Sequence, residues 1–136
     1  MNQKLLQVYE YAGTGLQRVV ESGDWFVGIK NYKPANDVSN LECLERHLLT
    51  DEVFVLLEGE CVLAVAEPAA ELNVKIVKME KNKVYCVKLG IWHTTILNRE
   101  CKMILVENRN TGEDNSEILN LSPELIMATQ AAVQAQ

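Results

Sequence analysis

Short apolar runs separated by polar turns fill most of this chain. The runs are rich in β-branched and aromatic residues, a composition that is typical of strands. About nine runs qualify, at residues 17–20, 25–32, 41–47, 52–57, 61–66, 74–79, 84–89, 93–97 and 101–106. The connectors at 58–60, 80–82 and 98–100 are short and polar, as hairpin loops are. The polar segment 108–120 is predicted to be turn-like.

The one predicted helix lies at the end of the chain. Ser122 is a good N-cap, Pro123 suits the first helical turn, and Glu124 complements the helix dipole there. Many short strands with a single helix at about 123–134 predict an all-β fold, either a sandwich or a small barrel. A closed barrel would also remove exposed strand edges, and its interior is a natural place for a small-molecule pocket.

Composition and charge narrow the class of protein. The 136 residues are enough for one domain with a real core, and 48% hydrophobic with 24% charged residues is ordinary for a soluble globular protein. No apolar run is long enough to span a membrane, and residues 1–13 lack the apolar core of a signal peptide, so we expect a cytoplasmic protein. The net charge of -6 disfavours a nucleic-acid partner.

The four cysteines do not form a CxxC pair, which argues against a structural zinc knuckle. In a reducing cytosol they are expected to be free thiols. Cys61, Cys86 and Cys101 lie in apolar runs, where cysteine usually behaves as a small buried hydrophobe. Trp25 and Trp92 are predicted to be core or pocket-wall residues.

The chain has only two histidines, and strand parity indicates where they point. Side chains alternate between the faces of a strand, so Glu45 and His47 share a face, while Glu52 and His93 each share a face with apolar residues of their own runs. These groups are therefore predicted to point inward. A buried carboxylate needs a partner, and two histidines with one carboxylate suit Fe, Mn, Ni or Zn.

A simpler interpretation of the same residues stays open. His47 and Glu52 would then flank a solvated turn, and His93 would be a core histidine bonded to a backbone carbonyl. Asp51 and Arg46 have the outward parity and are predicted to be solvated.

The pattern of these residues resembles two sequence motifs of the cupin superfamily. Its first motif is G-x5-H-x-H-x3,4-E-x6-G, and here His47, Glu52 and Gly59 match the second histidine, the glutamate and the final glycine. Its second motif is G-x5-P-x-G-x2-H-x3-N, and here Gly90 and His93 match the G-x2-H part. The resemblance covers residues 24–108 and implies a single cupin-type, jelly-roll-like β-barrel over residues 1–136, with a short C-terminal helix.

The chain departs from the pattern at three positions. Glu45 stands where the family has its first histidine, Lys88 replaces the proline of the second motif, and Ser39 replaces the opening glycine. Asn98 lies one place later than the motif's asparagine. The usual three-histidine, one-glutamate site is therefore altered.

Carried over by position, the resemblance implies that His47, Glu52 and His93 bind a divalent metal ion (Fe, Mn, Ni or Zn). Glu45 is then a fourth ligand, a hydrogen-bond partner of a ligand, or a general base whose pKa is raised by burial. Glu45 is the candidate catalytic residue.

The resemblance leaves three functions open. The first is a metal-dependent enzyme such as an isomerase, lyase or dioxygenase, the second is a module that binds a small molecule without turnover, and the third is a structural barrel whose site has decayed. No arginine has inward parity near the motifs, which disfavours a strongly anionic substrate. Small cupins are often dimers, so a homodimer is expected, with residues 5–11 or an edge strand pairing between chains.

Overall fold

The computed structural model describes residues 2–136 and contains two five-stranded antiparallel sheets. The first sheet has the order β1-β2-β9-β4-β7, and its strands are Leu16–Ser22, Trp25–Asn31, Lys102–Asn108, Glu52–Glu58 and Val84–Val87. The second has the order β10-β3-β8-β5-β6, and its strands are Ser116–Asn120, Cys43–His47, Trp92–Leu97, Cys61–Ala66 and Lys75–Lys78.

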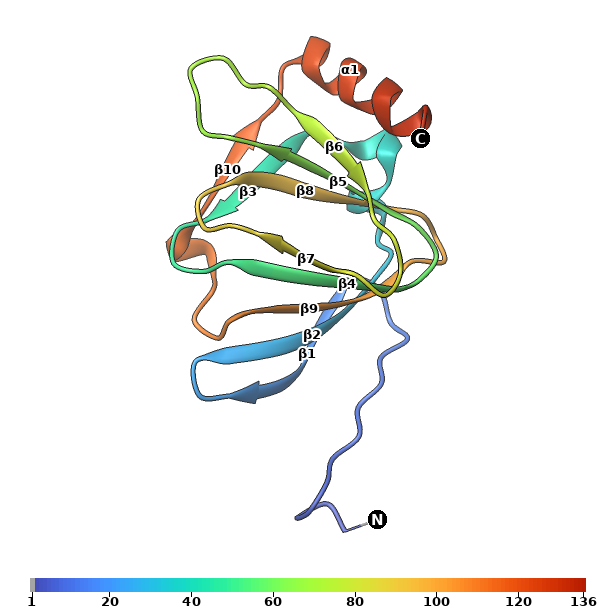
Figure 1. The fold of residues 1–136 in the computed structure, drawn as a ribbon, viewed down its shortest axis with the longest axis vertical. Coiled ribbons are helices and arrows are strands. Elements are labelled where there is room, and N and C mark those ends of the chain that lie inside the picture. Colours follow the sequence, from blue (N-terminus) through green and yellow to red (C-terminus); the bar gives the residue numbers. More distant parts are fainter. Residues whose placement is uncertain (1) are drawn as a thin grey trace.

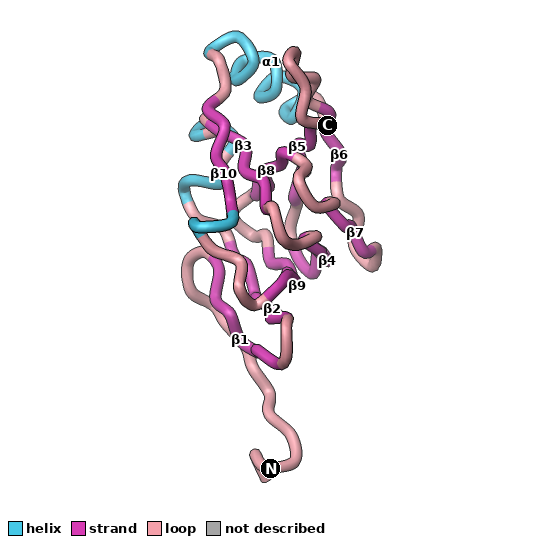
Figure 2. Tube along the Cα trace, turned by 90° about the vertical axis from the view of Figure 1, so that its left-hand side faces the viewer, coloured by secondary structure: helices cyan, strands magenta, loops and turns pink. Residues whose placement is uncertain are grey.

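The two sheets face each other, and helix α1 (Pro123–Gln134) lies outside the second sheet (Figure 1). Three short 3-10 helices, at Pro34–Asn36, Val38–Asn40 and Glu113–Asn115, lie in the connections. Residues 2–10 extend away from both sheets in the two perpendicular views (Figures 1 and 2), whereas the carbonyls of Tyr11 and Gly13 accept hydrogen bonds from Asn31 at the end of β2. Within residues 2–136, no helix combines the length and apolar character needed to cross a membrane.

Each of the nine strand runs predicted from the sequence forms a strand, with ends that shift by a few residues. The helix is confirmed as well, since the Ser122 hydroxyl accepts a hydrogen bond from the Leu125 amide at 3.2 Å. The prediction of turns throughout 108–120 was wrong, because β10 lies within that segment. Only two of its five residues, Ile118 and Leu119, are apolar, so this edge strand left no hydrophobic pattern to detect.

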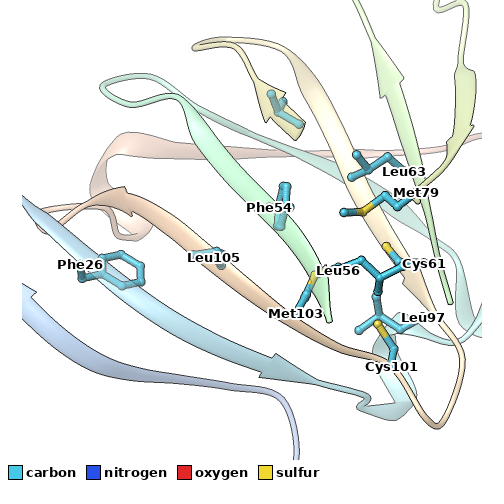
Figure 3. Packing of buried hydrophobic residues seen from close by; sticks show 11 residues of the cluster. Phe26, Phe54, Leu56, Cys61, Leu63, Met79, Leu97, Cys101, Met103 and Leu105 are labelled. Carbon is cyan, nitrogen blue, oxygen red and sulfur yellow. The ribbon is translucent and has the colours of Figure 1, made fainter. Parts of the chain in front are cut away.

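The interior between the sheets is filled by one apolar cluster (Figure 3). It combines large side chains from both sheets, and its most buried members include Phe26, Phe54, Cys61, Met103 and Leu105. Burying a side chain of this size stabilises the fold by about 1.5–3 kcal/mol relative to exposure. The alternating burial along β9 and β4 follows from this one-sided packing.

A second apolar cluster fills the space between the outer face of the second sheet and the helix. Helix residues Leu125, Ile126 and Val133 pack there against Leu44 and Ile96. Because the second sheet is covered on both faces, β5 is buried along almost its whole length rather than in alternation.

The burial predictions for the cysteines, the tryptophans and Arg46 are confirmed only in part. Cys61 and Cys101 are buried as expected, but Cys86 is exposed, because it lies on the outer face of edge strand β7. Trp25 is also exposed, at 45%, since it sits at the very start of β2. Trp92 is half-buried in the outer cluster, with the Arg46 guanidinium 4.5 Å from its ring centre, so Arg46 is less solvated than predicted.

Candidate metal centre

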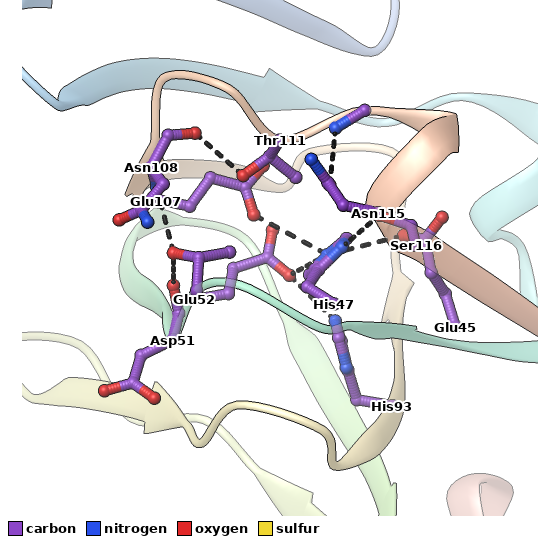
Figure 4. A network of polar contacts seen from close by, with 12 residues as sticks. Glu45, His47, Asp51, Glu52, His93, Glu107, Asn108, Thr111, Asn115 and Ser116 are labelled. Carbon is purple, nitrogen blue, oxygen red and sulfur yellow. Dashed lines mark hydrogen bonds and ion pairs between the residues drawn. The ribbon is translucent and has the colours of Figure 1, made fainter.

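Four strands bring the candidate residues together between the two sheets. β3 and β8 are neighbours in the second sheet, where Glu45 pairs with His93, and His47 lies two residues further on the same face of β3. β4 in the facing sheet supplies Glu52. The adjacent strand β9 supplies Glu107. Figure 4 shows these side chains converging from the two sheets.

The three predicted ligands meet at one carboxylate oxygen. Oε1 of Glu52 lies 2.7 Å from Nε2 of His93 and 3.2 Å from Nε2 of His47. All three residues are at most 6% exposed, so their side chains point inward as strand parity predicts. The solvated turn that was the simpler interpretation of His47 and Glu52 does not fit this burial.

The hydrogen bonds of His93 restrict its chemistry. Its Nδ1 lies 2.9 Å from the carbonyl oxygen of Ile91, which can only accept, so Nδ1 carries the proton. In a neutral ring, Nε2 then presents its lone pair to the Glu52 carboxylate. Two lone pairs at 2.7 Å repel each other unless a proton or a cation lies between them. Histidine ligands of metals are typically held by such a bond from the other ring nitrogen.

His47 has the same arrangement, with a different partner. Its Nδ1 lies 2.8 Å from the Ser116 hydroxyl on β10, and its Nε2 faces the carboxylates. Both imidazoles therefore direct Nε2 to a common point, while Nδ1 anchors each ring to the surrounding strands. The rings are 5.3 Å apart, centre to centre.

Glu107 belongs to this cluster but was not predicted from the sequence. It is buried, its Oε2 lies 3.6 Å from Nε2 of His47, and that oxygen has no hydrogen-bond partner among residues 2–136. The sequence did carry a signal, because Glu107 has the same parity as Met103 and Leu105, two buried residues of the same strand. The predicted apolar run ended one residue too early to include it.

Glu45 occupies the open side of the cluster. Its side chain is 47% exposed, and its Oε1 lies 3.6 Å from Nε2 of His47. Glu45 is therefore close enough to share a ligand with the two histidines, and its side chain still contacts solvent.

The electrostatics of the cluster follow from burial and close packing. Burial by itself would raise the pKa of Glu52, but the hydrogen bonds with His47 and His93 outweigh it and lower the pKa to about 2. Burial opposes the protonation of His47, yet the hydrogen bond and the charge of Glu52 raise its pKa. Burial and the charge of Glu52 raise the pKa of Glu107 to about 8. In the metal-free cluster Glu52 therefore carries a buried negative charge, while Glu107 is mainly protonated below about pH 8.

A pocket of about 230 Å³ opens beside the cluster. Its floor includes Glu52, Phe54 and His93, and the Phe54 ring lies edge-on to His93 at 6.5 Å, where the apolar core meets the polar site. The rest of the wall is mixed. Its polar members include Lys30, Asn36, Glu45 and Thr95, and Ala35, Cys43 and Ile118 are its less polar members. The pocket therefore connects the buried cluster to solvent on the side of Glu45.

The donor set fits a divalent cation. The ligand atoms of Glu45, His47 and His93 lie within 4.8 Å of one another, and so do those of His47, Glu52 and Glu107. A metal with ligands about 2.0–2.2 Å away places neighbouring ligand atoms about 3.0–3.5 Å apart. The contacts of Nε2 of His47 with the three carboxylates, at 3.2, 3.6 and 3.6 Å, lie in or next to that range. The 2.7 Å contact between His93 and Glu52 is shorter, so these two atoms would move apart on binding an ion. The unpartnered Glu107 oxygen is a further group that a cation would satisfy.

Neither a scan against protein-family models nor a search of curated proteins gave a match. Solved structures do match. BH2720 of Bacillus halodurans has a TM-score of 0.59 at 14% identity, over 85% of this chain and 83% of that one. Streptomyces PAC13, solved with uridine and described as a nucleoside dehydratase, has 0.56 at 10% identity, over 88% and 97%. A mutant of Bacillus subtilis oxalate decarboxylase has 0.53 at 14% identity, over 79% of this chain and 28% of that one.

The structures that this chain resembles include cupin-fold proteins, and the all-β jelly-roll prediction is confirmed. The chain has the cupin fold. The low identities establish the fold alone, so the chemistry must be argued from the residues of the site.

Proposed function

We propose that this protein binds a divalent metal ion (Fe, Mn, Ni or Zn) through His47, Glu52 and His93, and uses it to hold a small metabolite in the adjoining pocket. The observation that carries the proposal is the pairing of His93 with Glu52. The Nδ1 proton of His93 is committed to the Ile91 carbonyl, so its Nε2 lone pair and the Glu52 oxygen face the same point. A cation at that point would satisfy both groups.

The remaining carboxylates are assigned by their exposure. Glu107 lies on the closed side, is buried, and has an oxygen without a partner in the described chain, which suits a fourth ligand. Glu45 lies on the open side and lines the pocket, which suits a group that meets the bound metabolite. This division leaves Glu45 free to act as a general base, although the burial on which the sequence prediction based that role is absent, since the side chain is 47% exposed.

A bound ion would supply Lewis-acid polarisation of a substrate oxygen. Glu45 would then accept a proton from a molecule in the pocket, while Phe54 limits the access of water from the core side. Proton transfer beside a polarised oxygen is the chemistry of isomerases and lyases, so these two classes are the preferred activities. Dioxygenase activity requires that the ion be iron.

The second candidate function is binding without turnover. It is favoured by one observation, the replacement of the family's first histidine by the half-exposed Glu45. A site of this kind would still hold the metal and a small molecule, but substitution of Glu45 would change no reaction rate.

The experiment is elemental analysis of protein purified without an affinity tag, before and after supplementation with Fe, Mn, Ni and Zn. We expect one of these metals near stoichiometry, and its loss in His47→Ala, His93→Ala and Glu52→Gln. Glu100→Gln, an exposed glutamate in the β8–β9 turn, is the matched control and should keep the metal. Wild-type protein without any of the four metals after supplementation would overturn the proposal.

We also infer that the chain forms a homodimer in the cytoplasm. Four apolar side chains of the N-terminal segment, Leu5, Leu6, Val8 and Tyr9, are 47–84% exposed, and the sheets end in edge strands with free backbone groups. Analytical ultracentrifugation tests this, with a monomer at micromolar concentration as the result against it.

A further inference from the structure

The pocket beside the metal centre is lined by a lysine side chain that the proposed function does not use. Lys30 lies on β2, at the pocket wall, and donates a hydrogen bond from Nζ to the Thr95 hydroxyl at 2.9 Å. That is its one hydrogen bond in residues 2–136, and no carboxylate in this range lies within ion-pair distance of it. A lysine ammonium has three donors, so two remain for a ligand.

An acceptor without a partner lines the same wall. The Asn36 amide donates from Nδ2 to the Thr95 carbonyl at 3.1 Å, which fixes the orientation of the side chain. Its Oδ1 is buried and has no partner in the described chain. Thr95 thus holds both groups, through its hydroxyl and its carbonyl, and the pair offers positive donors beside a free acceptor.

The partial burial of Lys30 indicates the charge of a ligand that would pair with it. Burial lowers the pKa of Lys30, and the charge of Glu52 opposes that shift without cancelling it. A half-buried ammonium that lacks a paired anion loses part of its hydration, and an anionic ligand would offset that loss. Lys33 also lines the pocket and adds positive charge near its mouth.

The form of the site selects among anions. Phosphate sites usually combine a bidentate arginine or several backbone N–H groups, and no arginine lines this pocket. One ammonium with one acceptor suits a carboxylate that also carries a hydroxyl or N–H group. The volume of about 230 Å³ limits the ligand to a short molecule.

We propose that Lys30 binds the carboxylate of a short hydroxy acid or amino acid, whose hydroxyl or N–H group donates to Asn36, and that this acid is the metabolite of the metal site. The inference rests on the proposed function, since it names the substrate class of that site. It reverses the sequence-based expectation that an anionic substrate is disfavoured, because that expectation considered arginine and overlooked the half-buried Lys30.

The test is isothermal titration of the metal-loaded protein with two- to six-carbon hydroxy and amino acids, each compared with its uncharged amide. We expect at least one acid to bind more than 10-fold tighter than its amide. In Lys30→Met that preference should fall at least 10-fold while the metal content stays unchanged, and Lys30→Arg should keep part of it. Lys81→Met, in the exposed β6–β7 turn, is the control and should behave as wild type.

Asn36→Asp provides a second variant that leaves Lys30 in place. Its added negative charge should weaken binding of the acid more than binding of the amide, because only the acid is repelled by that charge. The proposal is overturned if no acid binds tighter than its amide, if inorganic phosphate binds in preference to every acid, or if the preference survives Lys30→Met. The last result would place the carboxylate on the metal instead. Loss of metal from wild type would instead contradict the proposed function, so the two failures can be told apart.

Discussion

Nε2 of His93 lies 2.7 Å from Oε1 of Glu52, although the proton of that ring is committed to Nδ1 by a 2.9 Å contact with the Ile91 carbonyl. The two residues come from facing sheets, so the fold itself brings these lone pairs together. Either a second proton on the His93 ring or a bound cation satisfies this pairing, and the proposed function places a cation there.

The first prediction concerns the partner of the other histidine. Ser116→Ala removes the hydroxyl that lies 2.8 Å from Nδ1 of His47, so the ring loses its anchor on β10. We expect metal affinity to fall by about 10- to 100-fold, the usual effect of removing such a partner. Competition with a fluorescent chelator measures the metal affinity of each variant. Ser22→Ala, at the exposed end of β1, should leave the affinity unchanged, and equal affinities in the two variants would contradict the role of Ser116.

The second prediction separates Glu45 from Glu107. If Glu107 is the fourth ligand, Glu107→Gln should lower metal affinity by at least 10-fold, because a buried carboxylate is lost from the closed side. Glu45→Ala should change affinity by less than about 3-fold, since this side chain is 47% exposed and screened by water. The same chelator assay decides between them, and the reverse order of effects would make Glu45 the ligand.

The third prediction concerns pH and the metal-free protein. The folded pKa of Glu107, about 8, lies above its ordinary value of 4.5. Its protonated form therefore contributes stability that is fully present below pH 4.5 and is lost as the pH rises through about 8. Glu107→Gln stays neutral throughout, so without metal it should gain stability relative to wild type between pH 5 and pH 9.

Urea denaturation in the presence of a chelator, at pH 5, 7 and 9, measures that gain. Glu113→Gln, at an exposed glutamate, should follow wild type at every pH. A Glu107→Gln profile parallel to that of wild type would show that Glu107 is not held in its protonated form.

The fourth prediction concerns the glycine that ends the first motif. Gly59 has a φ of +69°, and a Cβ there would lie 2.5 Å from the backbone nitrogen of Cys101. Gly23 has a φ of +56° with nothing within 4 Å, so it serves as the matched control. We expect Gly23→Ala to cost about 1 kcal/mol and Gly59→Ala about 3 kcal/mol or more, since the latter adds a backbone clash to the same strain. Urea midpoints measure both, and equal losses would contradict the clash.

Much of the fold could be predicted because each strand pattern is local. Alternation along residues 52–57 and 93–97 placed Glu52 and His93 on inward faces, and the motif spacings related them to His47. The edge strand β10 was missed, since a short strand with three polar residues carries no such pattern. Ser116, the partner of His47, was missed with it.

The rest of the site depends on pairings between distant strands. Lys30 lies in an apolar run and Glu107 directly after one, and strand parity gives a direction for each side chain but not the residues that it faces. Only the register of β9 on β4, and the position of β2 beside β9, bring them to the cluster and to its pocket. Their roles therefore became arguable only once the two sheets were in place.

The central claim is that both histidines bind one ion through Nε2. The most direct measurement is electron spin-echo spectroscopy of the protein loaded with one equivalent of Cu²⁺, which binds such ligands more tightly than the other divalent metals of the series. The remote ring nitrogens count the bound imidazoles. The account predicts two in wild type and one in either His47→Ala or His93→Ala. A spectrum without imidazole coupling, or one that neither substitution changes, would contradict it.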